Sequence, residues 1–252
     1  MAELTRKQRE IEQRMLEILK VARPILLREG FQALSMDRVA SQMEYAKGTI
    51  YNHFPNKEEI VVALAIQAVE LRNALFHAAA LDESVRNKPH RVRLMALGAA
   101  CEFFTTDCVE DFLVEQWIRN NNVWDKTSEK RHVLIVDREN ECMQVAAGIV
   151  NDALHSSDLS IPPHVTPQEF IFGFWALMFG TQILTHSSPS LQTLGIINPF
   201  QAIRLHCCAL FNGFGWLPLM EWEEYDQSLQ ELFNTLKPTF QAIRDQRQQN
   251  LS

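Results

Sequence analysis

Apolar residues recur at intervals of three and four along almost the whole chain, which is the period of an α-helix. The clearest run near the start comprises Ile11, Met15, Ile18, Leu19, Ala22, Ile25 and Leu26. No stretch alternates apolar and polar residues over the length of a β-strand, and no segment is repeated. The sequence therefore predicts an all-α protein.

The composition is that of a soluble globular protein, with 46% hydrophobic and 22% charged residues in a chain of 252. The first residues, MAELTRKQREIEQRM, contain no apolar region of the kind found in secretory signals, so we expect no signal. The most apolar run, Phe170 to Leu184, is shorter than the ~20 residues that a bilayer span needs. We expect it to form a buried helix, and we expect no association with a membrane.

The five cysteines are an odd number, and the sequence contains no CxxC motif. This pattern argues against a disulfide framework and favours buried thiols in a reducing, cytoplasmic compartment. Cys101 and Cys108 share one face of a predicted helix but lie roughly 10 Å apart, which is too far for one metal ion. We therefore expect neither a metal nor a cofactor.

Sequence motifs for catalysis are also missing, since the chain has no Gly-rich phosphate loop, no HExxH and no GxSxG. Glu221, Glu223 and Glu224 form a local acidic patch without a catalytic partner. An enzyme is the weakest alternative, and we predict no catalytic residues.

The net charge of −7 is distributed unevenly. Residues 1–57 contain ten Lys or Arg and seven Asp or Glu, a net charge of +3. Residues 58–252 contain fourteen Lys or Arg and twenty-four Asp or Glu, a net charge of −10. An acidic protein whose positive charge gathers at one end can still attract a polyanion to that end.

Local signals divide residues 1–57 into helices. Gly30 should end the first helix, and Pro24 inside that helix should cost one backbone hydrogen bond. Ser35 is a favourable N-cap for a short second helix, and a third should run from Lys47 to Phe54. Asn56, which follows a proline, can cap a long fourth helix.

Two short helices joined by a tight turn and packed against a longer first helix form a helix-turn-helix. The second helix of the pair lies in the DNA major groove. The third predicted helix suits this role, because Lys47, Gly48 and Thr49 are small or polar enough to reach base edges. Ile50 and Phe54 should instead face the core.

Other residues near this helix can contact DNA phosphates. Tyr51 and His53 have polar tips, and Lys57 lies where its own charge and a helix N-terminus both favour a phosphate. Ser35 is first a helix cap, although the start of its helix can also meet a phosphate. The predicted DNA-binding residues are Ser35, Lys47, Gly48, Thr49, Tyr51, Asn52, His53 and Lys57.

The stretch GFQALSMDRVASQMEYAKGTIYNHFPNKEEIV, Gly30 to Val61, resembles the helix-turn-helix of TetR-family transcriptional repressors. It has that family's order of a glycine with an aromatic, a capping Ser, a Val-Ala pair, a Gly-Thr-hydrophobic-Tyr helix, and a closing Phe-Pro followed by Lys-Glu. The resemblance implies a homodimer that binds an inverted-repeat operator in double-stranded DNA. It also implies a C-terminal helical domain that holds the dimer interface and a pocket for a small effector.

The turn of the motif departs from the family pattern. Met43, Glu44, Tyr45 and Ala46 stand where the family usually has Ala-Gly-Val-Ser. Glu44, in place of the usual glycine, must adopt a left-handed conformation or a different turn, at a cost of about 1 kcal/mol or more. Ala46 lacks a hydroxyl that could cap the recognition helix, so we assign it no phosphate contact.

Small residues form stripes on two helices predicted in the second half of the chain, a pattern that lets helices approach closely. The stripes are Gly173, Ala176 and Gly180 on one helix, and Ala202, His206, Ala209 and Gly213 on the next. They can pack against a second copy of the chain or inside one subunit, and the sequence leaves both open. Earlier in the chain, His90, Arg91 and Arg93 are expected at a solvated helix start, with contact to an anion as the alternative.

Aromatic rings and methionines of the middle helices are candidates for an effector pocket, with ordinary core packing as the alternative for each. Because pockets between helices are mostly apolar, we expect a mostly hydrophobic effector. The predicted ligand-binding residues are Phe103, Phe104, Trp117, Met143 and Trp175.

The sequence thus predicts a helix-turn-helix domain at residues 1–57, a connecting helix at 58–86, and a helical effector-binding and dimerisation domain at 87–252. The predicted function is a DNA-binding transcriptional repressor that a small molecule releases from its operator. One alternative is a helix-turn-helix activator or a DNA binder without a small-molecule ligand. Another is an all-helical adaptor protein, which would not bind DNA in a salt-dependent way.

Overall fold

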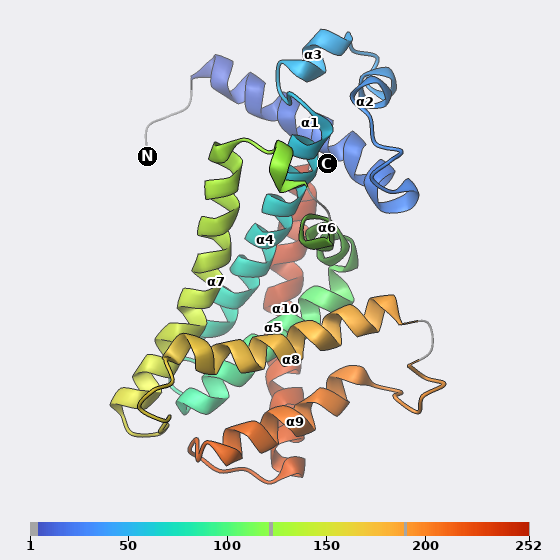
Figure 1. Ribbon diagram of the computed structural model, residues 1–252. Coiled ribbons are helices and arrows are strands. Elements are labelled where there is room, and N and C mark those ends of the chain that lie inside the picture. Colours follow the sequence, from blue (N-terminus) through green and yellow to red (C-terminus); the bar gives the residue numbers. More distant parts are fainter. Residues whose placement is uncertain (1–4, 121–122, 189–190, 252) are drawn as a thin grey trace. The chain divides into compact units, whose positions relative to one another are not determined.

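The computed structural model describes residues 5–120, 123–188 and 191–251, and within these ranges the regular structure is entirely helical (Figure 1). The prediction of an all-α fold is confirmed. The elements are α1 (Arg6–Glu29), α2 (Met36–Gln42), α3 (Lys47–Tyr51), α4 (Lys57–Leu81), α5 (His90–Asp107), α6 (Val109–Asn120), the short 3₁₀ helix η1 (Trp124–Lys126), α7 (Glu129–His155), α8 (Pro167–Ser187), α9 (Pro199–Gly213) and α10 (Trp222–Leu251).

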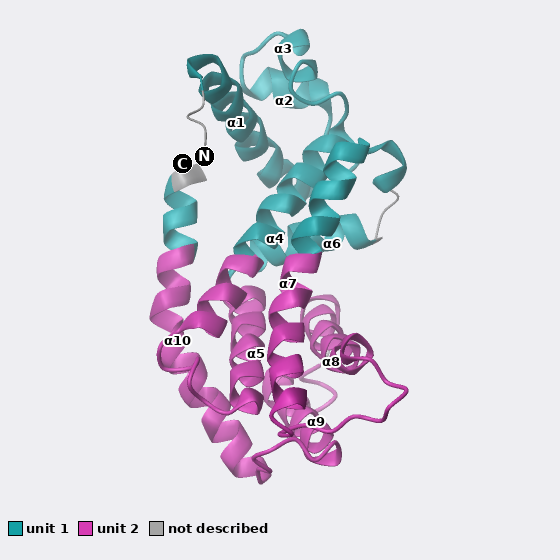
Figure 2. Ribbon diagram, turned by 90° about the vertical axis from the view of Figure 1, so that its left-hand side faces the viewer, with its two compact units in different colours: residues 1–71, 108–139, 244–252 teal, residues 72–107, 140–243 magenta. Residues whose placement is uncertain are grey.

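The chain divides into two compact units that are not successive in sequence (Figure 2). Unit 1 comprises Met1–Leu71, Cys108–Glu139 and Arg244–Ser252. Unit 2 comprises Arg72–Asp107 and Asn140–Ile243. The helices α4, α7 and α10 therefore each contribute residues to both units, while α1, α2, α3 and α6 belong to unit 1 alone.

The first helix of unit 1 begins and ends at recognisable caps. The Thr5 side chain accepts a hydrogen bond from the backbone N–H of Gln8, and the Gln8 side chain accepts one from the backbone N–H of Thr5. Gly30 follows the last turn with φ +83°, and its N–H donates to the Leu26 carbonyl at 3.1 Å, so it ends the helix as predicted. The helix continues through Pro24 and buries Ile18, Leu19, Ala22, Ile25 and Leu26.

The core of unit 1 gathers apolar residues from distant parts of the sequence. Val114 and Ile118 of α6, Val123, and Ile135 of α7 lie in one cluster with the buried faces of α1 to α4. The central element is α4, which is long and apolar enough to cross a membrane, but 72% of its most apolar window is buried inside the protein. In the structure α4 is therefore a core helix.

Unit 2 is built on aromatic packing around Trp216, which is fully buried. The Trp216 ring lies 5.0 Å from that of Phe211 and 5.6 Å from that of Phe170. Only one side of α8 takes part in this core. Phe172, Trp175 and Leu184 are exposed within the subunit, so the expectation that the run from Phe170 to Leu184 is a buried helix was wrong for these residues.

Candidate nucleic-acid interface

The first short helix of the motif, α2, begins at the predicted cap. The Ser35 hydroxyl accepts a hydrogen bond from the backbone N–H of Arg38 at 3.2 Å, and Asp37 lies in the first turn. Val39 and Ala40 are buried, and the helix packs against α3 (Figure 1). Ser35 therefore positions the helix pair by satisfying an N–H that would otherwise lack a partner.

The turn between α2 and α3 is closed by backbone hydrogen bonds. The N–H of Glu44 donates to the Ser41 carbonyl at 3.2 Å, and the N–H of Tyr45 donates to the Ala40 carbonyl at 2.9 Å. This pair of bonds is the Schellman motif, which requires a left-handed residue after the helix end. Glu44 supplies it with φ +55°, which is the first of the two alternatives that the sequence left open, a left-handed residue or a different turn.

The predicted recognition helix, α3, is five residues long and ends at Tyr51, three residues before the predicted end at Phe54. It presents mixed faces. Ile50 and Phe54 are fully buried, as predicted, and they fix the orientation of the helix. Lys47, Gly48, Tyr51 and Asn52 are exposed and Thr49 is half-buried, so these residues lie on the outward side. Ala46 caps α3 without a side-chain hydrogen bond, in line with the missing hydroxyl.

Two lysines of the predicted interface have partners within unit 1. The Nζ of Lys47 lies 2.6 Å from Oδ2 of Asp37 in an exposed ion pair. The Nζ of Lys57 donates to the Phe31 carbonyl at 2.9 Å and lies 4.0 Å from the centre of the Phe31 ring. These two contacts hold the Lys57 side chain in place. Because an ammonium group has three donors, Lys57 still has donors left for a further acceptor such as a phosphate.

His53 is half-buried beside α1, and its environment favours the neutral ring. Burial, with a smaller contribution from the charge of Arg14, lowers the pKa of His53 below its usual value near 6.5. Arg14 also lies over the ring of Tyr45, at 5.3 Å from its centre. His53 is therefore suited to donate or accept a hydrogen bond at neutral pH rather than to act as a cation.

The start of α4 carries contacts that the sequence did not reveal. Asn56 caps α4 as predicted, because its side-chain oxygen accepts from the N–H of Glu59 at 2.8 Å. Its side-chain nitrogen also donates to the carbonyl of Lys126 at 3.0 Å. The chain between α6 and α7 thus reaches the junction of α3 and α4, a long-range contact for which a single sequence holds no signal.

The predicted effector residues are not all brought together. Phe103 and Phe104 are buried in unit 2, where the Phe103 ring lies 5.3 Å from that of Phe240, and Met143 is half-buried there. Trp175 is 41% exposed on α8. Trp117 belongs to unit 1, with its ring 6.3 Å from that of Phe31.

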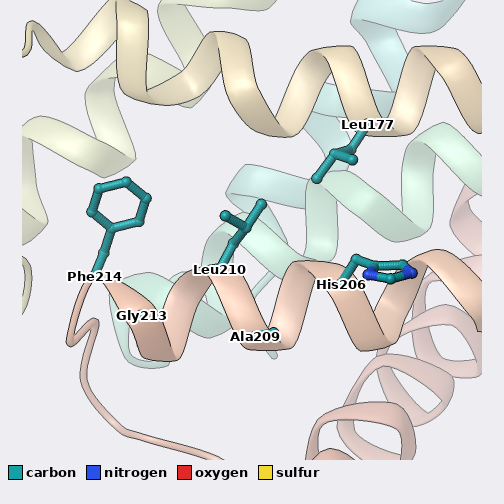
Figure 3. A pocket seen from close by; sticks show the side chains of 6 residues that line it. All are labelled: Leu177, His206, Ala209, Leu210, Gly213 and Phe214. Carbon is teal, nitrogen blue, oxygen red and sulfur yellow. The ribbon is translucent and has the colours of Figure 1, made fainter.

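An apolar groove lies in unit 2 along α8 and α9, with a volume of ≈ 410 Å³ (Figure 3). Its lining consists of Leu177, His206, Ala209, Leu210, Gly213 and Phe214. Three of these, His206, Ala209 and Gly213, belong to the small-residue stripe of α9 and are exposed. Gly173 and Ala176 of the α8 stripe are exposed as well, whereas Gly180 is half-buried. Within one subunit most of these small residues are therefore not covered by other helices.

Residues 18–64 match the family model for bacterial regulatory proteins of the tetR family. A curated relative, the DNA-binding transcriptional repressor TetR of Mycobacteroides abscessus, is 35% identical over 71 residues, which are 28% of this chain and 35% of that protein. The chain thus spans about a third of the length of the curated relative it matches.

The fold resembles solved structures over most of the chain. A regulatory protein of the tetR family from Rhodococcus RHA1 has a TM-score of 0.60 at 16% identity and covers 80% of this chain and 97% of its own. A TetR/AcrR-family transcriptional regulator from Thermobifida fusca YX-ER1 has a TM-score of 0.57 at 21% identity, with coverage of 80% and 98%. At these identities the likeness is one of fold.

Proposed function

We propose that this chain, which is a TetR-family transcriptional regulator, is a cytoplasmic repressor that binds an inverted-repeat DNA operator as a homodimer. A mostly hydrophobic small molecule would release it. The observation that carries the DNA-binding part is the surface of α3. Ile50 on this helix and Phe54 just after it are buried, so Lys47, Gly48 and Tyr51 face outward. The backbone at Gly48 can approach DNA closely, because glycine has no side chain and a Cβ at this position would have no neighbouring atom within 4 Å.

Base-reading and phosphate-binding residues should respond differently to substitution. Lys57→Ala should weaken binding to every sequence and lower the salt dependence by about one phosphate contact per subunit. Thr49→Ala should instead reduce the preference for particular base pairs, because its hydroxyl and methyl can read base edges. Both are measured by binding titrations at several salt concentrations, with operator fragments selected from a random DNA pool.

The control for this prediction is Lys88→Ala, which removes an exposed lysine of unit 2 and should leave both quantities unchanged. Unaltered binding by both Lys57→Ala and Thr49→Ala, in folded proteins, would contradict the assignment of this surface to DNA. Transcription from a promoter that overlaps the operator then separates repression from activation, because only a repressor lowers it.

The proposed dimer uses the outward stripes of α8 and α9. The groove between these helices is apolar, and Leu184 of α8 is also exposed. Large contiguous apolar patches are rare on monomers and mark interaction surfaces. A second copy of the chain supplies the same small stripes, and a two-fold axis would pair α8 and α9 with their counterparts.

The proposed effector lies among the rings of unit 2, and Trp175 is the probe. A hydrophobic compound bound beside Phe103, Phe104 and Met143 should quench the fluorescence of Trp175 and should bind more weakly when operator is present. Trp175→Phe should remove most of this quenching. Trp117→Phe is the matched control, since Trp117 lies in unit 1 and its loss should leave the quenching unchanged. A releasing compound whose signal survives Trp175→Phe would place the effector elsewhere.

A further inference from the structure

Two buried acidic residues lie at the helix end that we propose to meet a phosphate. Glu58 and Glu59 directly follow Lys57 in the first turn of α4, with exposures of only 7% and 3%. Carboxylates at a helix N-terminus are favoured by the helix dipole. They are nevertheless negative charges within one turn of a residue that must attract a negative phosphate.

Both carboxylates are paired with cations from one distant segment, Val123–Arg131, which we call the charge clamp. Lys126 Nζ lies 3.4 Å from Oε1 of Glu58. Arg131 Nε donates to Oε2 of Glu59, and the backbone N–H of Ser128 donates to Oε1 of the same residue. Each acidic side chain of this turn therefore has its own cation.

The charge clamp is also fixed by contacts other than these ion pairs. Asn56, the cap of α4, donates to the Lys126 carbonyl at 3.0 Å. The Arg131 guanidinium lies 5.0 Å from the centre of the Phe54 ring, and Phe54 is fully buried behind α3. Val123 lies in the core cluster of unit 1. These contacts hold the backbone at Lys126 and the guanidinium of Arg131 beside the start of α4.

We infer that Lys126 and Arg131 are positioning residues for operator binding, which keep the start of α4 electrically neutral so that Lys57 can hold a phosphate. This inference rests on the proposed function of Lys57. Neither cation needs to touch DNA. Each acts by compensating a buried carboxylate, which water screens less than it would an exposed one.

The charge clamp also suggests how regulation reaches this site. Arg131 lies near the start of α7, and the later residues of the same helix, from Asn140 on, belong to unit 2. A change that withdraws the charge clamp from α4 would uncover two negative charges beside the phosphate position. DNA affinity would then fall without any change in the residues that touch DNA.

The test compares the removal of a cation with the removal of the whole ion pair. Arg131→Met should weaken operator binding by about tenfold at low salt, and the deficit should shrink as salt screens the uncovered charge. Adding Glu59→Gln to Arg131→Met should restore most of the affinity, because no charge is then uncovered and the amide oxygen can still accept from Ser128. Lys126→Met, alone and combined with Glu58→Gln, repeats the same comparison for the second ion pair. The Lys126 side chain is 68% exposed, so its removal should not unfold the protein.

A matched control separates compensation from loss of positive charge in general. Lys130→Met removes one exposed cation next to Arg131 and leaves Glu58 and Glu59 paired, so it should change affinity less than about twofold. An equal loss in Lys130→Met and Arg131→Met would overturn the inference. So would a loss in Arg131→Met that Glu59→Gln does not restore, because that result assigns Arg131 a purely structural role.

The outcomes also distinguish this inference from the proposed function. If the parent protein shows no salt-dependent binding to any DNA, both are wrong. If the parent protein binds and loses affinity on Lys57→Ala, but Arg131→Met and Lys126→Met bind as the parent does, only the inference is wrong.

Discussion

The double variant Gly180→Leu, Ala209→Leu should be a folded monomer that binds a two-half-site operator at least a thousandfold more weakly than the parent protein. Each overpacked contact should cost about 1–3 kcal/mol. Because a two-fold axis places every substitution in the interface twice, the dimer would lose about 4–12 kcal/mol of association free energy. A monomer reaches only one half-site at a time, so it loses the contacts of the second recognition helix.

The substitutions should not unfold the subunit. A Cβ added at Gly180 meets no other atom within 4 Å, and Ala209 is exposed in the groove along α8 and α9. Gly148→Leu is the matched control, since Gly148 is an exposed helical glycine on α7 with equally open surroundings. Sedimentation at micromolar concentration and circular dichroism give the assembly and the helix content. A double variant that stays dimeric would exclude this surface as the interface.

Arg91→Ala should lower the free energy of unfolding by about 3–5 kcal/mol, because it removes a buried side chain that donates several hydrogen bonds within unit 2. The side chain is fully buried, and its Nη1 donates to Oδ1 of Asn212 at 2.7 Å and to the carbonyls of Trp216 and Pro218 at 3.0 and 2.8 Å. Its guanidinium also lies 5.3 Å from the centre of the Phe211 ring. The variant leaves these acceptors without their donor and opens a cavity beside the aromatic core.

The control for Arg91→Ala is Arg93→Ala on the same helix. Arg93 pairs at 3.3 Å with Asp152, which is 57% exposed, and partly exposed pairs of this kind contribute about 0–1 kcal/mol. Urea unfolding of the three proteins at one concentration gives the comparison, since dimerisation makes stability depend on concentration. Equal midpoints for Arg91→Ala and Arg93→Ala would show that the buried guanidinium does not hold unit 2 together.

Arg91 also corrects an expectation of the sequence. His90, Arg91 and Arg93 were predicted to form a solvated helix start, and Arg91 is instead fully buried. Burial lowers its pKa below the ordinary arginine value. Its acceptors come from residues 212–218, more than a hundred positions away, and no local pattern around residue 91 announces them.

The sequence by itself determined the features that depend on a few neighbouring residues. It predicted the end of α1 at Gly30, the cap at Ser35 and the inward Ile50 and Phe54, and the structure has each of them. It also limited Glu44 to a left-handed conformation or a different turn, and the structure has the left-handed one. Caps, left-handed turns and helical periodicity are interactions within one or two turns of chain. Their causes are therefore visible in the residues beside them.

Only the tertiary structure decided which surfaces meet. An apolar run such as Phe170 to Leu184 has no clearly polar face, so its sequence does not show which face is buried. In the structure this helix packs against α5 and α9, and Trp175 is left exposed. Trp117 lies with Phe31 in unit 1, and Arg131 pairs with Glu59, 72 positions away. Such partners are chosen by the packing of whole helices. A single sequence, in which every buried aromatic or arginine has many possible neighbours, does not specify them.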